Sequence, residues 1–147
     1  MAFDCFLKID TIPGECTDSE HQDWIELLSF EHGVSQPSSG SVGSGGARTA
    51  ERVDHGDLTV FKAIDKATPK LFLQCCNGKH IPTVKIEVCR AGERKQKYYE
   101  VIMNDVIVRS VDMAGRAKGS NSAPLPVDTV SFAYGKIKWN YTETNHK

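Results

Sequence analysis

The sequence lacks any excess of charge of one sign. Its 147 residues include 18 basic and 19 acidic side chains, which gives a formal net charge of −1 at neutral pH. Domains that bind nucleic acid normally carry a clear basic excess, because they neutralise phosphates, so this balance argues against a nucleic-acid partner. The sequence also lacks an apolar run of about 20 residues, the length that a helix needs to cross a bilayer, so no membrane insertion is expected.

The pattern of a cleaved signal peptide is missing too. Residues 1–10 alternate apolar and polar side chains, without a basic leader or a continuous apolar stretch. The cysteine count, five, is odd, and Cys75 and Cys76 are adjacent, which disfavours a direct bridge between them. We therefore expect reduced thiols in a chain that folds in the cytoplasm.

No group of residues has the spacing of a catalytic or metal-binding set. The histidines show no ligand-like spacing, and Cys76 and His80 are separated by Asn77-Gly78, which should end a helix between them. The run Asp54-His55-Gly56-Asp57 is typical of turn and cap residues at the start of a strand. No cysteine is singled out as a nucleophile with a nearby base. We therefore expect no catalytic residues, no cofactor, no metal and no enzyme activity.

What the sequence does contain is a series of segments with the two-residue period of β-strands. Residues 3–10 alternate in this way and predict a half-buried first strand. Trp24, Leu28 and Phe30 share one face of the next predicted strand, residues 24–33. Ser29 and Glu31 fall on the other face, which predicts that this face meets water.

Four later segments complete the strand pattern. Residues 53–64 carry apolar side chains on both faces, which predicts a strand whose second face is covered by the helix that follows. Residues 82–90 and 98–111 flank a charged turn and predict an antiparallel hairpin. Residues 127–141 form the last predicted strand, and their apolar parity switches at Gly135, where a bulge or bend is expected.

One short helix is predicted, at about residues 68–77. Thr68 is the expected N-cap and Pro69 the first helical residue, where a missing N–H costs nothing. Asn77 and Gly78 suit a left-handed C-cap. Two pairs of apolar residues spaced four apart give the helix an apolar face: Leu71 with Cys75, and Phe72 with Cys76.

Two long segments rich in glycine and serine, residues 35–52 and 113–126, connect these elements. The first is too long for an ordinary connection, and loops of such length are usually functional or disordered. The residues before it are too few to fold alone, so we expect a single domain over residues 1–147. The predicted fold is mainly β: an antiparallel β-barrel of two sheets with one lateral α-helix.

Several segments, taken in order along nearly the whole chain, carry a family resemblance. They are residues 1–10, 12–16, Asp18, His21, 25–30, 32–36, 61–71, 76–80 and 130–141. In this succession they resemble the Hcp family, the hemolysin-coregulated tube proteins of bacterial type VI secretion. One position departs from the family pattern, since Cys16 stands where serine is common.

The resemblance implies a structural protein. Six copies of such a β-barrel close into a ring, and the rings stack into a hollow tube that is exported and that binds or chaperones small effector proteins in its lumen. The implied partners are further copies of the chain, the sheath and spike proteins of the apparatus, and effectors. The chain would assemble in the bacterial cytoplasm and then be secreted without a cleaved signal peptide. No appended enzymatic domain is expected.

On this interpretation, the sequence offers candidate contact residues. Ser29 and Glu31 are the lumen and effector-binding candidates, because they lie on the polar face of their strand. Lys70, on the outer face of the helix, is a candidate for subunit contact. The candidates for contact with a neighbouring subunit or ring in the first long loop are Ser39, Gly40, Ser41, Val42, Gly43 and Ser44.

A hypothesis from another class is a monomeric, secreted β-barrel that binds a carbohydrate or protein ligand. It would use exposed aromatic side chains such as Trp24 or Trp139. A tube subunit should assemble in solution, whereas a binding module should remain a monomer of about 16 kDa. The mass of the native protein therefore separates the two hypotheses.

Overall fold

The computed structural model describes residues 3–39, 49–50, 52–92, 96–115 and 125–143. Within them, seven strands form one antiparallel sheet in the order β2-β1-β9-β10-β11-β8-β3. The period-two segments of the sequence supply these strands. Their bounds are β1 (Phe3–Ile9), β2 (Ile25–Leu27), β3 (Ser29–Glu31), β8 (Leu58–Ala63), β9 (Ile81–Arg90), β10 (Lys97–Ala114) and β11 (Val127–Tyr141).

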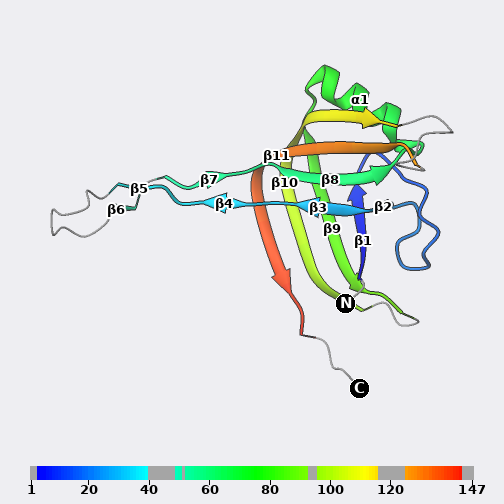
Figure 1. Cartoon of the computed structure of the whole chain (residues 1–147), viewed down its shortest axis with the longest axis horizontal. Helices are drawn as coiled ribbons and strands as arrows, with labels where there is room; N and C mark the ends of the chain where they lie inside the picture. Colours follow the sequence, from blue (N-terminus) through cyan, green and yellow to red (C-terminus); the bar gives the residue numbers. More distant parts are fainter. Residues whose placement is uncertain (1–2, 40–48, 51, 93–95, 116–124, 144–147) are drawn as a thin grey trace.

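The sheet curls into a nearly closed barrel (Figure 1). Its two terminal strands, β2 and β3, are consecutive in the chain and are joined by Leu28, whose N–H donates to the Phe61 carbonyl at 2.7 Å. The chain thus crosses from one layer to the other at this point. The predicted antiparallel barrel with one lateral helix is confirmed, and both of its layers belong to one bent sheet.

The long hairpin of β10 and β11 bends sharply where the sequence parity switches (Figure 1). Asp105 adopts a left-handed backbone, with φ of 53°. A Cβ placed on Gly135 would lie 2.9 Å from the Asp105 carboxylate, so glycine is what permits this close approach. Before the bend, β11 pairs with β8 over Val127–Phe132 as well as with β10. After the bend, it pairs with β10 alone among the described strands.

The barrel interior holds the main core. Apolar side chains of every strand of the large sheet face inward, and Phe132, Leu7, Ile25 and Leu58 are among the largest that are fully buried. A smaller cluster of Phe6, Cys16 and Cys89, with Trp24 beside it, lies apart from the main core. Phe6 is therefore buried although its parity is opposite to that of Leu7.

The face predicted for residues 24–33 is wrong in its first half. Ile25 and Leu27 are buried, whereas Leu28 is 58% exposed. The segment is two short strands, β2 and β3, and the crossing at Leu28 breaks the alternation on which the prediction depended. Beyond the crossing the prediction agrees with the structure, because Phe30 packs against the core.

The helix α1 (Ala67–Asn77) packs on β10 through Leu71, which is fully buried, and through Cys75, whose thiol donates to the Arg109 carbonyl at 3.6 Å. Leu73 faces solvent and is 63% exposed. Gly78 provides the predicted left-handed C-cap, with φ of 63°. Because the helix docks on β10, it does not cover the second face of β8 as the sequence indicated.

The predicted N-cap is wrong, because Thr68 lies inside the helix. Its hydroxyl instead accepts from the Asp65 N–H at 3.1 Å and donates to Asp128. Asp65 performs the local capping, since its carboxylate accepts from the Ala67 N–H at 3.0 Å. Thr68 is thus recruited into a buried polar network that the sequence pattern does not reveal.

That network centres on Lys62, which is fully buried. Its ammonium donates to Asp65 and to Asp128, at 2.8 Å each, and to the Thr68 hydroxyl at 3.1 Å. Lys62 and Asp128 are direct partners across β8 and β11. The network therefore fixes the start of α1 to the barrel wall.

An arm built from two small ladders extends from the barrel between β3 and β8 (Figure 1). The inner ladder joins β4 (Val34–Ser35) to β7 (Asp54–His55), and the outer one joins β5 (Ser38–Ser39) to β6 (Thr49–Ala50). The described part of the long excursion predicted for residues 35–52 is thus an antiparallel arm.

Candidate interaction surfaces

The predicted polar face of the second segment lies on β3. Ser29 and Glu31 are both exposed, while Phe30 between them is half-buried. They pair with Phe61 and Thr59 of β8, which holds them at the margin of the barrel sheet. The structure thus leaves both side chains accessible to a ligand, and their lumen role stays a prediction.

The other predicted contact residues lie on the arm and the helix. Ser39 is in β5 and pairs with Thr49. Lys70 is exposed on α1. Gly40, Ser41, Val42, Gly43 and Ser44 lie outside the described residues. The arm and the helix lie at different places on the barrel (Figure 1), so Ser39 and Lys70 do not form one surface.

The base of the arm is fastened to the bend of β11 through Tyr134. Its hydroxyl donates to the Gly56 carbonyl at 3.2 Å, so its oxygen accepts from His32 Nε2 at 2.7 Å and from His55 Nδ1 at 2.9 Å. Burial, followed by the charge of His55, lowers the pKa of His32. Burial, followed by the charge of Asp57, raises the pKa of Tyr134.

The sequence did not identify this cluster, because its members are far apart in the chain. A hollow of about 370 Å³ adjoins it, lined by His55, Tyr134, Ile137 and Trp139 among others. Trp139 is 44% exposed, and its ring centroid lies 6.0 Å from that of His32. The hollow combines aromatic and polar groups, which suits contact with another polypeptide or a small ligand.

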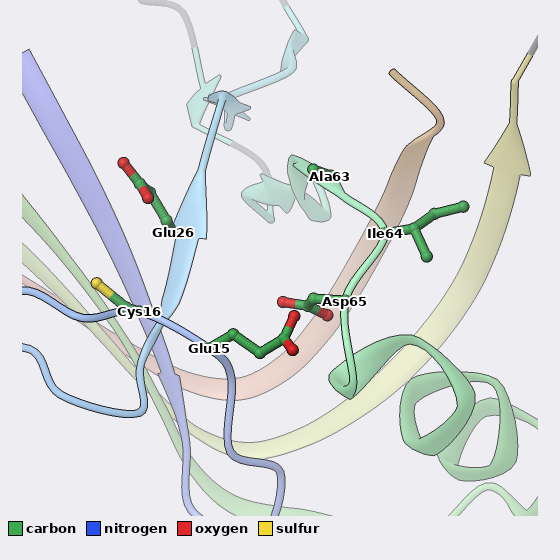
Figure 2. A pocket seen from close by; sticks show the side chains of 6 residues that line it. All are labelled: Glu15, Cys16, Glu26, Ala63, Ile64 and Asp65. Atoms are coloured by element: carbon green, nitrogen blue, oxygen red, sulfur yellow. The ribbon is translucent and has the colours of Figure 1, made fainter.

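A second hollow, of about 180 Å³, lies where β2, the 11–24 loop and the start of α1 meet. Figure 2 shows the carboxylates of Glu15 and Asp65 facing one another across it, while Glu26 projects from β2 on the far side of Cys16. Ile64 adds an apolar side chain that is 42% exposed. This end of the barrel is therefore acidic, with an apolar contact beside the carboxylates.

His21 holds the 11–24 loop against the sheet. Its Nδ1 lies 2.7 Å from Asp18 and its Nε2 lies 2.9 Å from Glu87, and its ring stacks on Phe6 with centroids 4.0 Å apart. Each ring nitrogen therefore faces a carboxylate oxygen, one from the loop and one from β9. His21 is 3% exposed, and its role is structural.

The five cysteines all lie among the described residues and are free thiols. Burial, followed by the neighbouring Cys89, raises the pKa of Cys5 to about 12. Burial and nearby carboxylates raise the pKa of Cys89 to about 11. These two thiols stay protonated at neutral pH and are poor nucleophiles.

The described part of the chain offers neither clustered metal ligands nor a membrane-spanning helix. No group of three or more histidine, cysteine, aspartate or glutamate side chains there is arranged to hold a metal ion. None of the helices in that part has the length and apolar character needed to span a membrane.

Comparisons with known proteins agree with the architecture. Residues 6–141 match the sequence profile of the type VI secretion system effector Hcp. The chain is 40% identical over 142 residues to protein hcp1 of Pseudomonas aeruginosa, covering 96% of this chain and 84% of that protein. It is 26% identical over 132 residues to the major exported protein of the same organism, covering 87% and 74%.

A solved structure of a type six secretion system protein superposes with a TM-score of 0.89 and 30% identity, covering 99% of this chain and 87% of that chain. The family so matched is a structural, secreted one, not a family of enzymes. Both the profile, which spans most of the chain, and the level of identity decide the assignment. The chain belongs to the Hcp family of the type VI secretion system.

Proposed function

We propose that six copies of this chain close into a ring and that the rings stack into a hollow tube. The observation that carries the proposal is the family match over residues 6–141, on a barrel whose helix and arm leave it at different places. Closed rings require heterologous contacts, in which two different surfaces of the subunit meet. Surfaces on different sides of the barrel suit such contacts.

The tube would hold small effector proteins in its lumen, and Ser29 and Glu31 would line that lumen. Both side chains are exposed on β3, and neither is needed to fill the core. A serine hydroxyl and a carboxylate present hydrogen-bonding groups and one negative charge to a passing protein. Such a wall binds without the apolar burial that would trap its cargo.

The arm is the proposed contact between neighbouring subunits or stacked rings, through Ser39 and the residues up to Ser44. Its two ladders extend from the barrel, which carries the outer ladder of β5 and β6 away from the barrel wall (Figure 1). Lys70, exposed on α1, is the proposed contact of the helix with an adjacent subunit.

The tube would be assembled in the bacterial cytoplasm and then exported with the sheath and spike proteins of the apparatus as partners. One relative, the major exported protein of Pseudomonas aeruginosa, is named for its export. Export of the intact chain is the direct test: the mass of the secreted protein should equal that of the cytoplasmic one.

The mass of the native protein tests the assembly itself. Native mass spectrometry and light scattering should give six times the 16.2 kDa of the chain, with higher multiples as rings stack. Salt should be varied in the same series, because polar and charged ring contacts weaken as salt screens them. A monomer at every concentration and ionic strength would overturn the ring.

A monomeric binding module is the second candidate, favoured by the exposure of Trp139 beside the 370 Å³ hollow. Aromatic faces with nearby polar groups are suited to stacking on a ligand such as a sugar ring. This candidate requires that Trp139 remain exposed in the native protein. A monomer in which glycans quench tryptophan fluorescence, with loss of the effect in Trp139→Ala, would favour it over the tube.

A further inference from the structure

The second half of β11 is an open sheet edge. From Lys136 to Tyr141 this strand pairs with β10 on one side, and no described strand pairs with its other side. Trp139 is 44% and Tyr141 is 70% exposed along it. An edge with unpaired backbone groups and exposed aromatic side chains is a surface on which another chain can dock.

This edge carries positive charge. Lys136 and Lys138 are both exposed on it, and they alternate with Ile137, which is half-buried against the core. Alternating lysines on an edge strand discourage unspecific pairing with apolar strands. They also select for a partner whose surface is acidic.

The opposite end of the same layer is acidic. The layer runs from β11 through β10, β9 and β1 to β2, which is a terminal strand of the sheet. Residues 3–28, which supply β1, β2 and the loop between them, contain seven acidic side chains and one lysine. Glu26 of β2 and Glu15 of the loop are exposed there (Figure 2).

The strand register places the charges of both ends on one face of the layer. Lys138 pairs with Ile102, which pairs with Lys85, which pairs with Lys8 of β1. Glu26 pairs with Phe6, two residues from Lys8 and therefore on the same face. If the layer of one copy continued into that of the next, Lys136 and Lys138 would lie beside Glu26.

We propose that the open edge of β11, Lys136–Tyr141, docks on the acidic β2 end of a second copy of this chain. This inference rests on the proposed ring and names the surfaces that form it. The two ends differ, so the contact is heterologous and generates rings rather than paired dimers. Pairing of two β11 edges with each other would bring lysines of like charge together, which is unfavourable.

A charge exchange between the two ends tests the contact. Lys138→Glu and Glu26→Lys, each alone, place like charges at the contact and should raise the protein concentration for half-assembly by about tenfold or more at low salt. The double variant should return that concentration close to the wild-type value. Lys79→Glu, a reversal at an exposed lysine beyond α1, is the matched control and should assemble as wild type.

Disulfide trapping gives an independent readout. In a Cys76→Ser background, which removes an exposed thiol, Lys138→Cys combined with Glu26→Cys should form a ladder of covalent oligomers that ends at the ring. Either substitution alone should give no ladder. A covalent dimer from Lys138→Cys alone would instead indicate β11 edges meeting each other, and would overturn the heterologous contact.

The outcomes separate this inference from the ring itself. A wild-type protein that forms rings, with no loss of assembly in either single variant and no covalent ladder, overturns the β11–β2 contact and leaves the ring intact. A wild-type monomer at all concentrations overturns both. Rescue in the double variant, together with the ladder, supports both.

Discussion

At the scale of single residues, the buried ammonium of Lys62 decides how the helix is attached. A buried lysine is tolerated only when its charge is paired and its protons are bonded. Asp65, Thr68 and Asp128 meet that requirement, and the second oxygen of Asp128 is buried without a described partner. Removal of the lysine would therefore leave Asp128 as a buried charge supported by Thr68 alone.

We expect Lys62→Met to lower the free energy of unfolding by about 3–5 kcal/mol, because breaking a buried pair leaves one uncompensated charge. Urea unfolding at one fixed protein concentration measures the change. The double variant Lys62→Met with Asp128→Leu should recover part of the loss, since neither charge then remains. Lys66→Met, at an exposed lysine four residues away, is the control. If Lys62→Met were as stable as Lys66→Met, the role of the buried Lys62–Asp128 pair would be contradicted.

At the scale of elements, the strands were predictable because half-buried strands alternate, and the C-cap was predictable because Gly78 suits a left-handed residue. The N-terminus of the helix was not predictable. The local sequence favours Thr68 as the N-cap, whereas in the fold its hydroxyl donates to Asp128, 60 residues away. The face of β2 was inverted because the crossing at Leu28 depends on the closure of the barrel, which is a property of the whole sheet.

The bend of the long hairpin depends on the pair Gly135 and Asp105. A Cβ on Gly135 would lie 2.9 Å from the Asp105 carboxylate and 3.2 Å from its Cβ, so Gly135→Ala should destabilise the fold by about 1–3 kcal/mol. The cost should shrink in an Asp105→Gly background, where the clash is removed and the positive φ is relieved. Thermal unfolding of the four proteins measures the coupling.

Gly33→Ala is the matched control for the bend, because a Cβ there would meet nothing within 4 Å. Its stability should stay within about 0.5–1 kcal/mol of wild type. If Gly135→Ala were as stable as Gly33→Ala, the close approach of the two strands would not be what requires glycine.

The base of the arm should loosen in mild acid. The folded-state pKa of His32 is lowered by burial and by His55, so the unfolded segment takes up a proton first as the pH falls. The stability that neutral His32 contributes is therefore present above the ordinary histidine pKa of about 6.5. It is lost as the pH falls through the lower pKa of the folded state.

Hydrogen exchange of β4 and β7, corrected for the intrinsic pH dependence, should show lower protection at pH 5 than at pH 7.5. His32→Gln keeps an N–H donor for Tyr134 but does not titrate, so it should reduce the difference. Asp57 and Arg109 form an ion pair at 3.2 Å nearby. Equal protection at both pH values would contradict the prediction.

At the scale of the whole molecule, the candidate sites were predictable only where a local pattern carries them. The exposure of Ser29 and Glu31 follows from alternation within one strand. The Tyr134 cluster, the acidic hollow and the open edge of β11 arise from residues that the barrel brings together or leaves unpaired. Assembly surfaces of this kind depend on which strands end up at an edge, and the sequence does not encode that locally.

The lumen assignment predicts a change in cargo without a change in the ring. Glu31→Lys reverses an exposed charge that takes no part in the core, so ring size in native mass spectrometry should stay constant. Retention of a co-expressed small effector should fall or rise several-fold, according to the charge of the effector. Ser29→Lys, on the same face of β3, should act in the same direction. Loss of the ring instead would place Glu31 at a subunit contact.

The arm should control stacking and leave ring closure intact. Replacing residues 40–48 by an Asn-Gly turn keeps both ladders and the Tyr134 fastening, because β5 and β6 are already antiparallel partners. We expect the shortened chain to form single rings in native mass spectrometry but few stacks in electron micrographs. The full-length variant Val42→Ser shows whether stacking depends on the length of the loop or on this apolar side chain. Since the arm extends beyond the barrel, stacks as long as those of wild type would mean that the ring faces alone hold the tube together.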